Sequence, residues 1–467
     1  MSARRRRALI TIAALVVVLG LATWLTLFRQ SFPSYTDDVE HFKYGSVGVE
    51  ANSGLPYWAW YVMPAVCGGH PAGKAGYERF GFTFEPGHET PVGMPVGRVG
   101  FERIGINCAL CHVGSVRTSA TAARQTLPGA PTSRFDLQGY LRFLFSCGES
   151  AHFNPDDVLA EINKVHPLPV NEALAYRYIV IPMMKQALAV QKAQMSWMER
   201  NPSWGPGRSD PFNPAKAQLL LLPPDGTIGN SDPPPLWNMK ERRSLHWDGL
   251  NDSLTEIVVN SGIGNGASNG SINLRSLARM QNWVTGLKSP VYPFQIDRDR
   301  ATRGRRVYDV ECASCHAAGA VQTGYTVPLA QLGTDSYRLA SWGDKVADGF
   351  NGLAGYDWRY TRFRPTSGYV AVPLDGIWSR APYLHNGSVP YLADLLKAPA
   401  ERPRTFYRGY DVYDPERVGF LADGDAARAE GWTLDTAQPG NSNGGHEWGT
   451  RLAGETKRDL LEYLKTL

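Results

Sequence analysis

Two five-residue stretches carry residue types whose spacing indicates chemistry. They are residues 108–112 (CALCH) and 312–316 (CASCH). On a helical turn, positions i, i+3 and i+4 lie on one face, so two thiols can bond one porphyrin while the imidazole lies over its iron. This is the attachment pattern of a c-type haem. The predicted thioether cysteines are Cys108, Cys111, Cys312 and Cys315, and the predicted axial ligands are His112 and His316.

The same cysteine spacing also begins some zinc sites and thioredoxin-like redox pairs. Here both pairs carry the adjacent histidine, and the N-terminus has the features of an exported chain. We therefore expect two covalently bound haem c groups, with a redox partner protein or a small-molecule oxidant as the partner.

Composition narrows the class of protein. At 467 residues, the chain can form two or three domains with cores of their own. A net charge of only +4 argues against a nucleic-acid partner. The 48 glycines and 33 prolines fit long loops that wrap around large flat cofactors.

The N-terminus predicts membrane insertion. A run of arginines at 4–7 precedes residues 8–28, which are apolar apart from three threonines. That length approaches the thickness of a bilayer core, and the basic flank would stay in the cytoplasm. Without a small-x-small cleavage site, a retained anchor is favoured over a signal peptide. We expect residues 1–30 to hold the protein on the periplasmic side of the bacterial inner membrane; cleavage would leave it periplasmic or secreted.

The expected fold class is mainly α and loop-rich, with two cytochrome c-like haem domains behind this membrane-spanning helix. Residues 31–290 are predicted to form the N-terminal haem domain with long insertions, and residues 291–467 the C-terminal cytochrome c domain. A helix is expected over 301–311, leading into the second motif, and an amphipathic helix over 454–467. Cys67 and Cys147 remain outside the motifs, either as a disulfide or as two buried thiols.

Axial ligands beyond the motifs are less well defined. Candidates for the first haem are His70, His88, Met63 and Met94, although surface histidines and core methionines are commoner. Trp237 and Trp247 lie in aromatic and polar stretches that are expected to line a haem pocket or the gap between the haems. The alternative is a structural, tryptophan-rich turn.

Two histidines follow the second motif. His385 and His446 both lie in polar, glycine-containing loops, where the backbone can come close to a ligand. Either would make the second iron six-coordinate and suited to electron transfer. The residues alone do not choose between them.

An ordered set of stretches carries a family resemblance. Residues 105–112 (GINCALCH), 245–249 (LHWDG), 384–390 (LHNGSVP) and 440–446 (GNSNGGH) together resemble the dihaem cytochromes related to bacterial rubber oxygenases. These are distant relatives of bacterial dihaem cytochrome c peroxidases. The resemblance covers most of the chain after residue 35 and implies two cytochrome c-like domains with one haem each.

The resemblance also implies ligands. The haem on His112 would have an open or oxygen-bound distal side, and the haem on His316 would have a second histidine ligand. His446 is the first choice for that ligand and His385 the alternative. In the related peroxidases, the histidine at the position of His385 lies near the haem instead, where it holds propionates together with an arginine, here Arg380.

The chain departs from the peroxidase pattern after Trp247-Asp248-Gly249. Leu250 replaces an arginine, and Ile257 and Ala267 stand where a glutamine and the catalytic glutamate would be. Peroxide cleavage needs a group that moves a proton, so ordinary peroxidase activity is not implied. Rubber oxygenases are also longer than this chain, so polyisoprene does not follow as its substrate.

The sequence therefore predicts an exported dihaem c-type cytochrome oxidoreductase. The C-terminal haem would transfer or store electrons. The N-terminal haem would react with oxygen or peroxide, with Trp247 and Trp237 as candidate catalytic residues. The alternatives are a pure electron-transfer cytochrome with both haems six-coordinate and a cytochrome c peroxidase-like enzyme.

Overall fold

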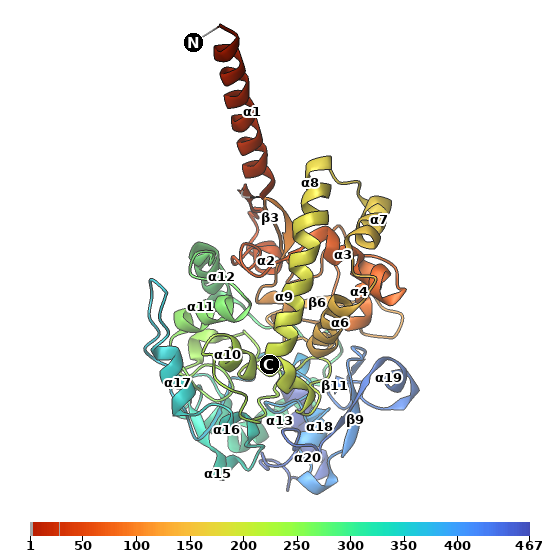
Figure 1. The fold of residues 1–467 in the computed structure, drawn as a ribbon. Coiled ribbons are helices and arrows are strands. Elements are labelled where there is room, and N and C mark those ends of the chain that lie inside the picture. The colour runs from red at the N-terminus through yellow and green to blue at the C-terminus, as the bar shows by residue number, and fades with distance from the viewer. Residues whose placement is uncertain (1–2, 28) are drawn as a thin grey trace.

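The computed structural model describes residues 3–27 and 29–467. Helix α1 (Ala3–Leu27) projects from one end of the body, and the remaining helices and strands gather below it (Figure 1). The predicted segment 1–30 includes residues 1, 2 and 28, which lie outside the described residues.

The prediction of an N-terminal membrane-spanning helix is wrong by this structure. Within the two described ranges, no helix combines the length and the apolar character needed to cross a membrane. In α1, the arginines at 4–7 occupy the first turns.

The prediction of a mainly α fold is also wrong, because helices are mixed with small antiparallel sheets. The largest sheet has the strand order β1-β3-β4-β2, and each other sheet in the described part of the chain is a strand pair. Between β3 and β4, Gly100 has φ of +74°, which suits a tight turn. The strands are β1 (Gln30–Ser31), β2 (Leu55–Pro56), β3 (Val96–Val99), β4 (Phe101–Ile104), β5 (Val113–Val116), β6 (Gln125–Pro128), β7 (Thr326–Pro328), β8 (Gly368–Val370), β9 (Thr405–Arg408), β10 (Tyr413–Asp414), β11 (Gly419–Phe420) and β12 (Trp432–Asp435).

The first half of the body is built around an aromatic core. Trp60 stacks on Tyr77 with ring centroids 4.2 Å apart, and its indole N–H donates to the Tyr140 hydroxyl. A disulfide joins Cys67 on α3 to Cys147 on α6, so these two cysteines are paired. The helices of this half are α2 (Asp38–Tyr44), α3 (Tyr57–Gly68), α4 (Lys74–Tyr77), α5 (Ala109–His112), α6 (Leu137–Glu149), α7 (Pro155–Val165), α8 (Val170–Ala175), α9 (Ile181–Gln194), α10 (Asn213–Gln218), α11 (Leu254–Gly264) and α12 (Leu274–Gly286).

The second half closes with its last helix packed on its first. Its helices are α13 (Arg298–Glu311), α14 (Ala313–His316), α15 (Leu329–Leu332), α16 (Tyr337–Ala340), α17 (Asp344–Asn351), α18 (Leu392–Leu395), α19 (Gly424–Glu430) and α20 (Gly454–Leu464). Helix α13 crosses α20 at Gly304, where a Cβ atom would lie only 1.8 Å from the Asp459 carbonyl oxygen. Glycine is therefore required for this close approach, which places the turn of the second motif directly after a rigid helix.

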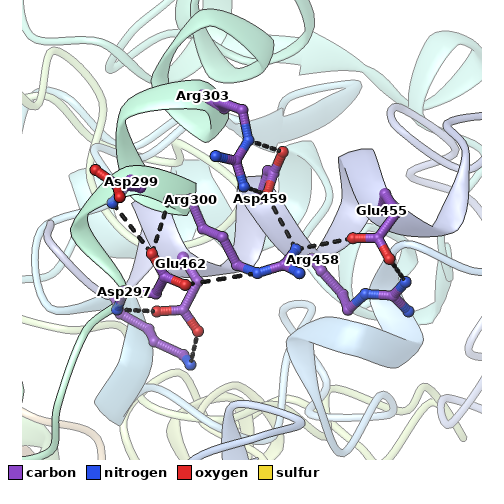
Figure 2. A network of polar contacts seen from close by, with 9 residues as sticks. Asp297, Asp299, Arg300, Arg303, Glu455, Arg458, Asp459 and Glu462 are labelled. Atoms are coloured by element: carbon purple, nitrogen blue, oxygen red, sulfur yellow. Dashed lines mark hydrogen bonds and ion pairs between the residues drawn. The ribbon is translucent and has the colours of Figure 1, made fainter.

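Ion pairs line the outer side of the same crossing (Figure 2). Arg300 Nη1 lies 2.9 Å from Glu455 Oε2 and 3.1 Å from Asp459 Oδ1, and Arg303 Nε lies 2.8 Å from Asp459 Oδ2. Because Arg303 and Glu455 are exposed and Arg300 is partly exposed, solvent weakens each pair and it contributes little. The buried contact at the glycine holds the two helices together.

The two halves of the chain share buried contacts. Val116, Leu127 and Trp237 belong to the same apolar cluster as Trp378 and Leu460. The predicted domain boundaries at 290 and 291 are not tested by these contacts and stay a prediction.

Candidate functional site

The turn of the first motif is fixed by a buried asparagine. The Asn107 side chain donates to the carbonyls of Phe42 and Gly45, at 3.1 and 2.9 Å, and accepts from the Ala109 N–H at 2.9 Å. Gly93 lies against the same turn, where a Cβ would come within 2.1 Å of the Leu110 nitrogen. Residues 108–112 therefore form one helical turn with Cys108, Cys111 and His112 in the expected order.

His112, at the end of that turn, is suited to ligate a metal. Its ring lies within hydrogen-bonding reach of the Pro234 backbone. The pKa of His112 is lowered to about 4, first by burial and then by the nearby His246 and Arg242. Its imidazole is therefore neutral at pH 7, which is the form that binds metal ions.

The four proposed distal ligands of the first haem have different surroundings. His70 is exposed. His88 stacks on Tyr44 at 3.9 Å and lies 3.3 Å from a Glu40 oxygen. Met63 and Met94 are buried in the aromatic core of the first half.

The structure instead brings His246 close to His112. The preceding residue, Leu245, packs in one apolar cluster with Ala109 and Val113, on either side of the first motif. His246 itself has φ of +61°, a left-handed conformation that non-glycine residues rarely adopt. The pKa of His246 is lowered to about 3, first by burial and then by Arg338. The LHWDG turn contributed to the family resemblance, but His246 was not among the predicted ligands. The sequence feature that could have indicated it is an imidazole directly before Trp247.

The second motif is held by hydrogen bonds to loop backbone. His316 Nδ1 lies 2.7 Å from the Val372 carbonyl oxygen, so it is the protonated nitrogen and donates this bond. A backbone acceptor on one ring nitrogen fixes the tautomer and leaves the other for a metal. The Thr323 hydroxyl donates to the Cys315 carbonyl at 3.0 Å and closes the turn.

His446 faces His316 across a largely apolar cavity, and their ring centroids are 6.3 Å apart. Two imidazoles that share one metal ion have centroids about 6.2 Å apart, given a metal–nitrogen bond of about 2.0 Å and a ring radius of about 1.1 Å. The pair therefore fits one iron between its rings. The backbone supports this placement, since the His446 N–H donates to the Leu332 carbonyl at 2.8 Å.

His385 and Arg380 line the same cavity. The His385 ring stacks on Tyr369 at 3.9 Å, and its Nε2 is buried without a partner among the described residues. Arg380 donates to the carbonyls of Pro373, at 2.8 Å, and Asp375.

The two candidate tryptophans have different surroundings. Trp247 also lines the cavity of His316, and its indole N–H donates to the Asp232 carbonyl at 2.7 Å. Trp237 is fully buried, donates to the Pro128 carbonyl at 2.9 Å, and lies beneath the Arg380 guanidinium at 5.8 Å. The cavity therefore reaches Trp247 directly.

A zinc site would need three or four side-chain ligands. Over residues 3–27 and 29–467, no group of three or more His, Cys, Asp or Glu side chains is arranged to hold a metal ion. A haem iron takes only one or two axial side chains, so the paired histidines match haem better than zinc.

Comparison with known proteins adds a partial match. Residues 368–407, which include Arg380 and His385, match the family model described as RoxA-like, cytochrome c-like. This confirms the predicted cytochrome c-like character for that segment. A cytochrome c-like domain implies covalently bound haem c and an oxidoreductase or electron-transfer role.

Two relatives come from Sinorhizobium fredii, and both are uncharacterised. The protein y4iM is 31% identical over 293 residues, which cover 52% of this chain and 66% of that protein. The protein y4iJ is 31% identical over 256 residues, which cover 40% of this chain and 42% of that protein. The chain thus spans less than two thirds of either relative.

Proposed function

We propose that the protein is an exported dihaem c-type cytochrome. The haem bound at Cys312 and Cys315 would have His316 and His446 as its axial ligands and would transfer electrons. The observation that carries this proposal is the 6.3 Å separation of the two imidazole centroids. Of the two histidines left open by the sequence, His446 is the one with a ring contact to His316.

Haem c supplies one-electron redox chemistry and, where a coordination position is open, reactivity toward oxygen or peroxide. The chain supplies the surroundings. The Val372 carbonyl orients the His316 ring, and leucines of α18 and α20 give the cavity an apolar wall that excludes water. His385 and Arg380, on the same wall, are assigned to haem carboxylates and not to the iron.

The first site is assigned to the reaction with oxygen or peroxide. The haem would be attached at Cys108 and Cys111 with His112 as its axial ligand. Trp247 is the candidate catalytic residue nearest the second site, because it lines the cavity of His316. Trp237 is enclosed by other side chains and is retained as the weaker candidate.

A second function, pure electron transfer, is favoured by one specific observation. His246 lies close enough to His112 to lower the pKa of that imidazole. If His246 ligates the first iron, both haems are six-coordinate and the protein only relays electrons to a redox partner.

Export is supported by the Cys67–Cys147 disulfide. Disulfides persist in oxidising compartments and are rare in the cytosol. We propose a periplasmic or secreted location.

Low-temperature EPR of the purified ferric protein tests the proposal. We expect His446→Ala to convert one low-spin haem into a high-spin haem, because water or no ligand replaces the imidazole. The matched control His385→Ala should leave that haem low-spin. A wild-type spectrum without any bis-histidine low-spin signal, or the same conversion in His385→Ala only, would contradict the assignment.

The same spectra separate the two functions. A high-spin signal from the first haem in the wild type supports reaction with oxygen or peroxide. Two low-spin signals, one of which is lost in His246→Ala, support pure electron transfer.

A further inference from the structure

Arg242 is a buried cation without a visible partner. It is 9% exposed, and its Nε and Nη2 atoms have no hydrogen-bond acceptor. Across residues 3–27 and 29–467, no hydrogen bond or ion pair reaches its guanidinium. A buried charge without a hydrogen-bond partner is strongly disfavoured, so this arrangement favours an anion that is not part of the chain.

A second buried guanidinium lies beside it. Arg380 is 6% exposed, and its Nε also has no partner among the described residues, although its two terminal nitrogens bond to backbone carbonyls. The pKa of Arg380 is lowered to about 9, first by burial and then by Arg242. The two buried guanidiniums repel each other, and negative charge between them offsets this repulsion.

The nearby protein carboxylate balances only part of this charge. Asp375 raises the pKa of both arginines. Its Oδ2 is already bonded to the Asn238 side chain at 3.1 Å. Asp375 therefore does not supply acceptors for the free donor atoms of Arg242.

Each arginine belongs to the surroundings of a different predicted haem site. Met239 and Leu245, which flank Arg242 in the chain, pack in one apolar cluster with Ala109 of the first motif. Arg380 lines the cavity that holds His316 and His446.

We infer that Arg242 binds a propionate of the haem on His112, separately from Arg380, which is already assigned to a carboxylate of the haem on His316. This inference rests on the proposed dihaem function. Guanidinium forks bind carboxylates through two parallel hydrogen bonds, and the unpaired Nε and Nη2 of Arg242 provide such a fork. Arg242 acts as a positioning residue that also sets the reduction potential.

The effect on potential has a definite sign. A buried cation disfavours the ferric haem, which carries one more positive charge than the ferrous haem. Removing the cation therefore stabilises the ferric form and lowers the midpoint potential of the haem that it contacts.

The test is a redox titration of the dihaem protein, followed by EPR so that the two haems are separated. We expect Arg242→Gln to lower the midpoint potential of the haem on His112 more than that of the haem on His316. The control Arg243→Gln removes an exposed arginine one position away and should leave both midpoints unchanged. Unchanged midpoints in Arg242→Gln, with both haems attached, would overturn the inference.

A second variant covers the case in which Arg242→Gln does not fold. Arg242→Lys keeps a cation but cannot make the two-pronged bond, so the midpoint of the haem on His112 should lie below that of wild type. A wild-type midpoint in Arg242→Lys would overturn the inference. Failure of the proposed function is recognised separately, as a wild-type protein that carries fewer than two haems.

Discussion

Replacing Asp411 by asparagine should strongly destabilise the fold. The Asp411 carboxylate is fully buried and receives hydrogen bonds from Arg117 Nε at 2.7 Å, Arg124 Nε at 2.6 Å and the Ser115 hydroxyl at 2.7 Å. Arg134 Nε lies 3.8 Å from Asp411 Oδ2. The carboxylate comes from the loop before β10, whereas all four partners belong to the region around β5 and β6. This contact therefore joins the two halves of the chain.

The magnitude follows from the pKa. Burial alone would raise the pKa of Asp411, but the bonds from Arg124 and Ser115 and the charge of Arg134 outweigh it and hold the pKa at about 2, against an ordinary 3.8. A difference of nearly two units corresponds to about 2–3 kcal/mol. Asparagine also removes the counter-charge of Arg124 and Arg134 and leaves Arg117 only its 3.5 Å contact with Glu430, which raises the expected loss to about 3–5 kcal/mol.

The assay is denaturant unfolding of wild type and Asp411→Asn across a pH series. Because the pKa is depressed in the folded state, the carboxylate stabilises the protein above pH 3.8 and loses this effect as the pH falls toward 2. The two proteins should therefore differ most near pH 7 and converge below pH 4. Asp425→Asn, at an almost fully exposed carboxylate, is the control. A loss below about 1 kcal/mol at pH 7, or a difference that is constant with pH, would refute the reasoning.

Two further predictions concern the turns that hold the haem motifs. Asn107→Ala should cost about 2–4 kcal/mol, because it removes three buried hydrogen bonds and leaves backbone carbonyls unsatisfied; an unfolding midpoint equal to that of wild type would contradict this. Gly304→Ala should lower the thermal midpoint, because its methyl would meet the Asp459 carbonyl oxygen at 1.8 Å and push α13 away from α20. Gly286→Ala, where a Cβ meets nothing within 4 Å, is its control, and equal midpoints for both variants would show that the crossing has room.

Local elements were predictable because their signals are local. The residue pattern before Cys312 predicted a helix over 301–311, and α13 covers Arg298–Glu311. The terminal amphipathic pattern predicted a helix over 454–467, and α20 covers Gly454–Leu464. The strands were missed because they are two to four residues long, too short for alternation to be recognised.

Long-range pairings could not be predicted in this way. The proposed choice of His446 over His385 depends on where two loops are held, and the His446 N–H donates to the Leu332 carbonyl in one of them. Proximity of His246 to His112 likewise results from the packing of Leu245 on the first motif. Sequence spacing fixes geometry within a turn and says little about which turns meet.

The haem content per chain, measured from the pyridine haemochrome absorbance of the purified protein, tests the assignment of two covalently bound haems. Two haems per chain are expected in wild type. One haem is expected in the double variant Cys108→Ser/Cys111→Ser and one in Cys312→Ser/Cys315→Ser. A wild-type content of one haem, or a double variant that loses none, would contradict the assignment of two covalently bound haems.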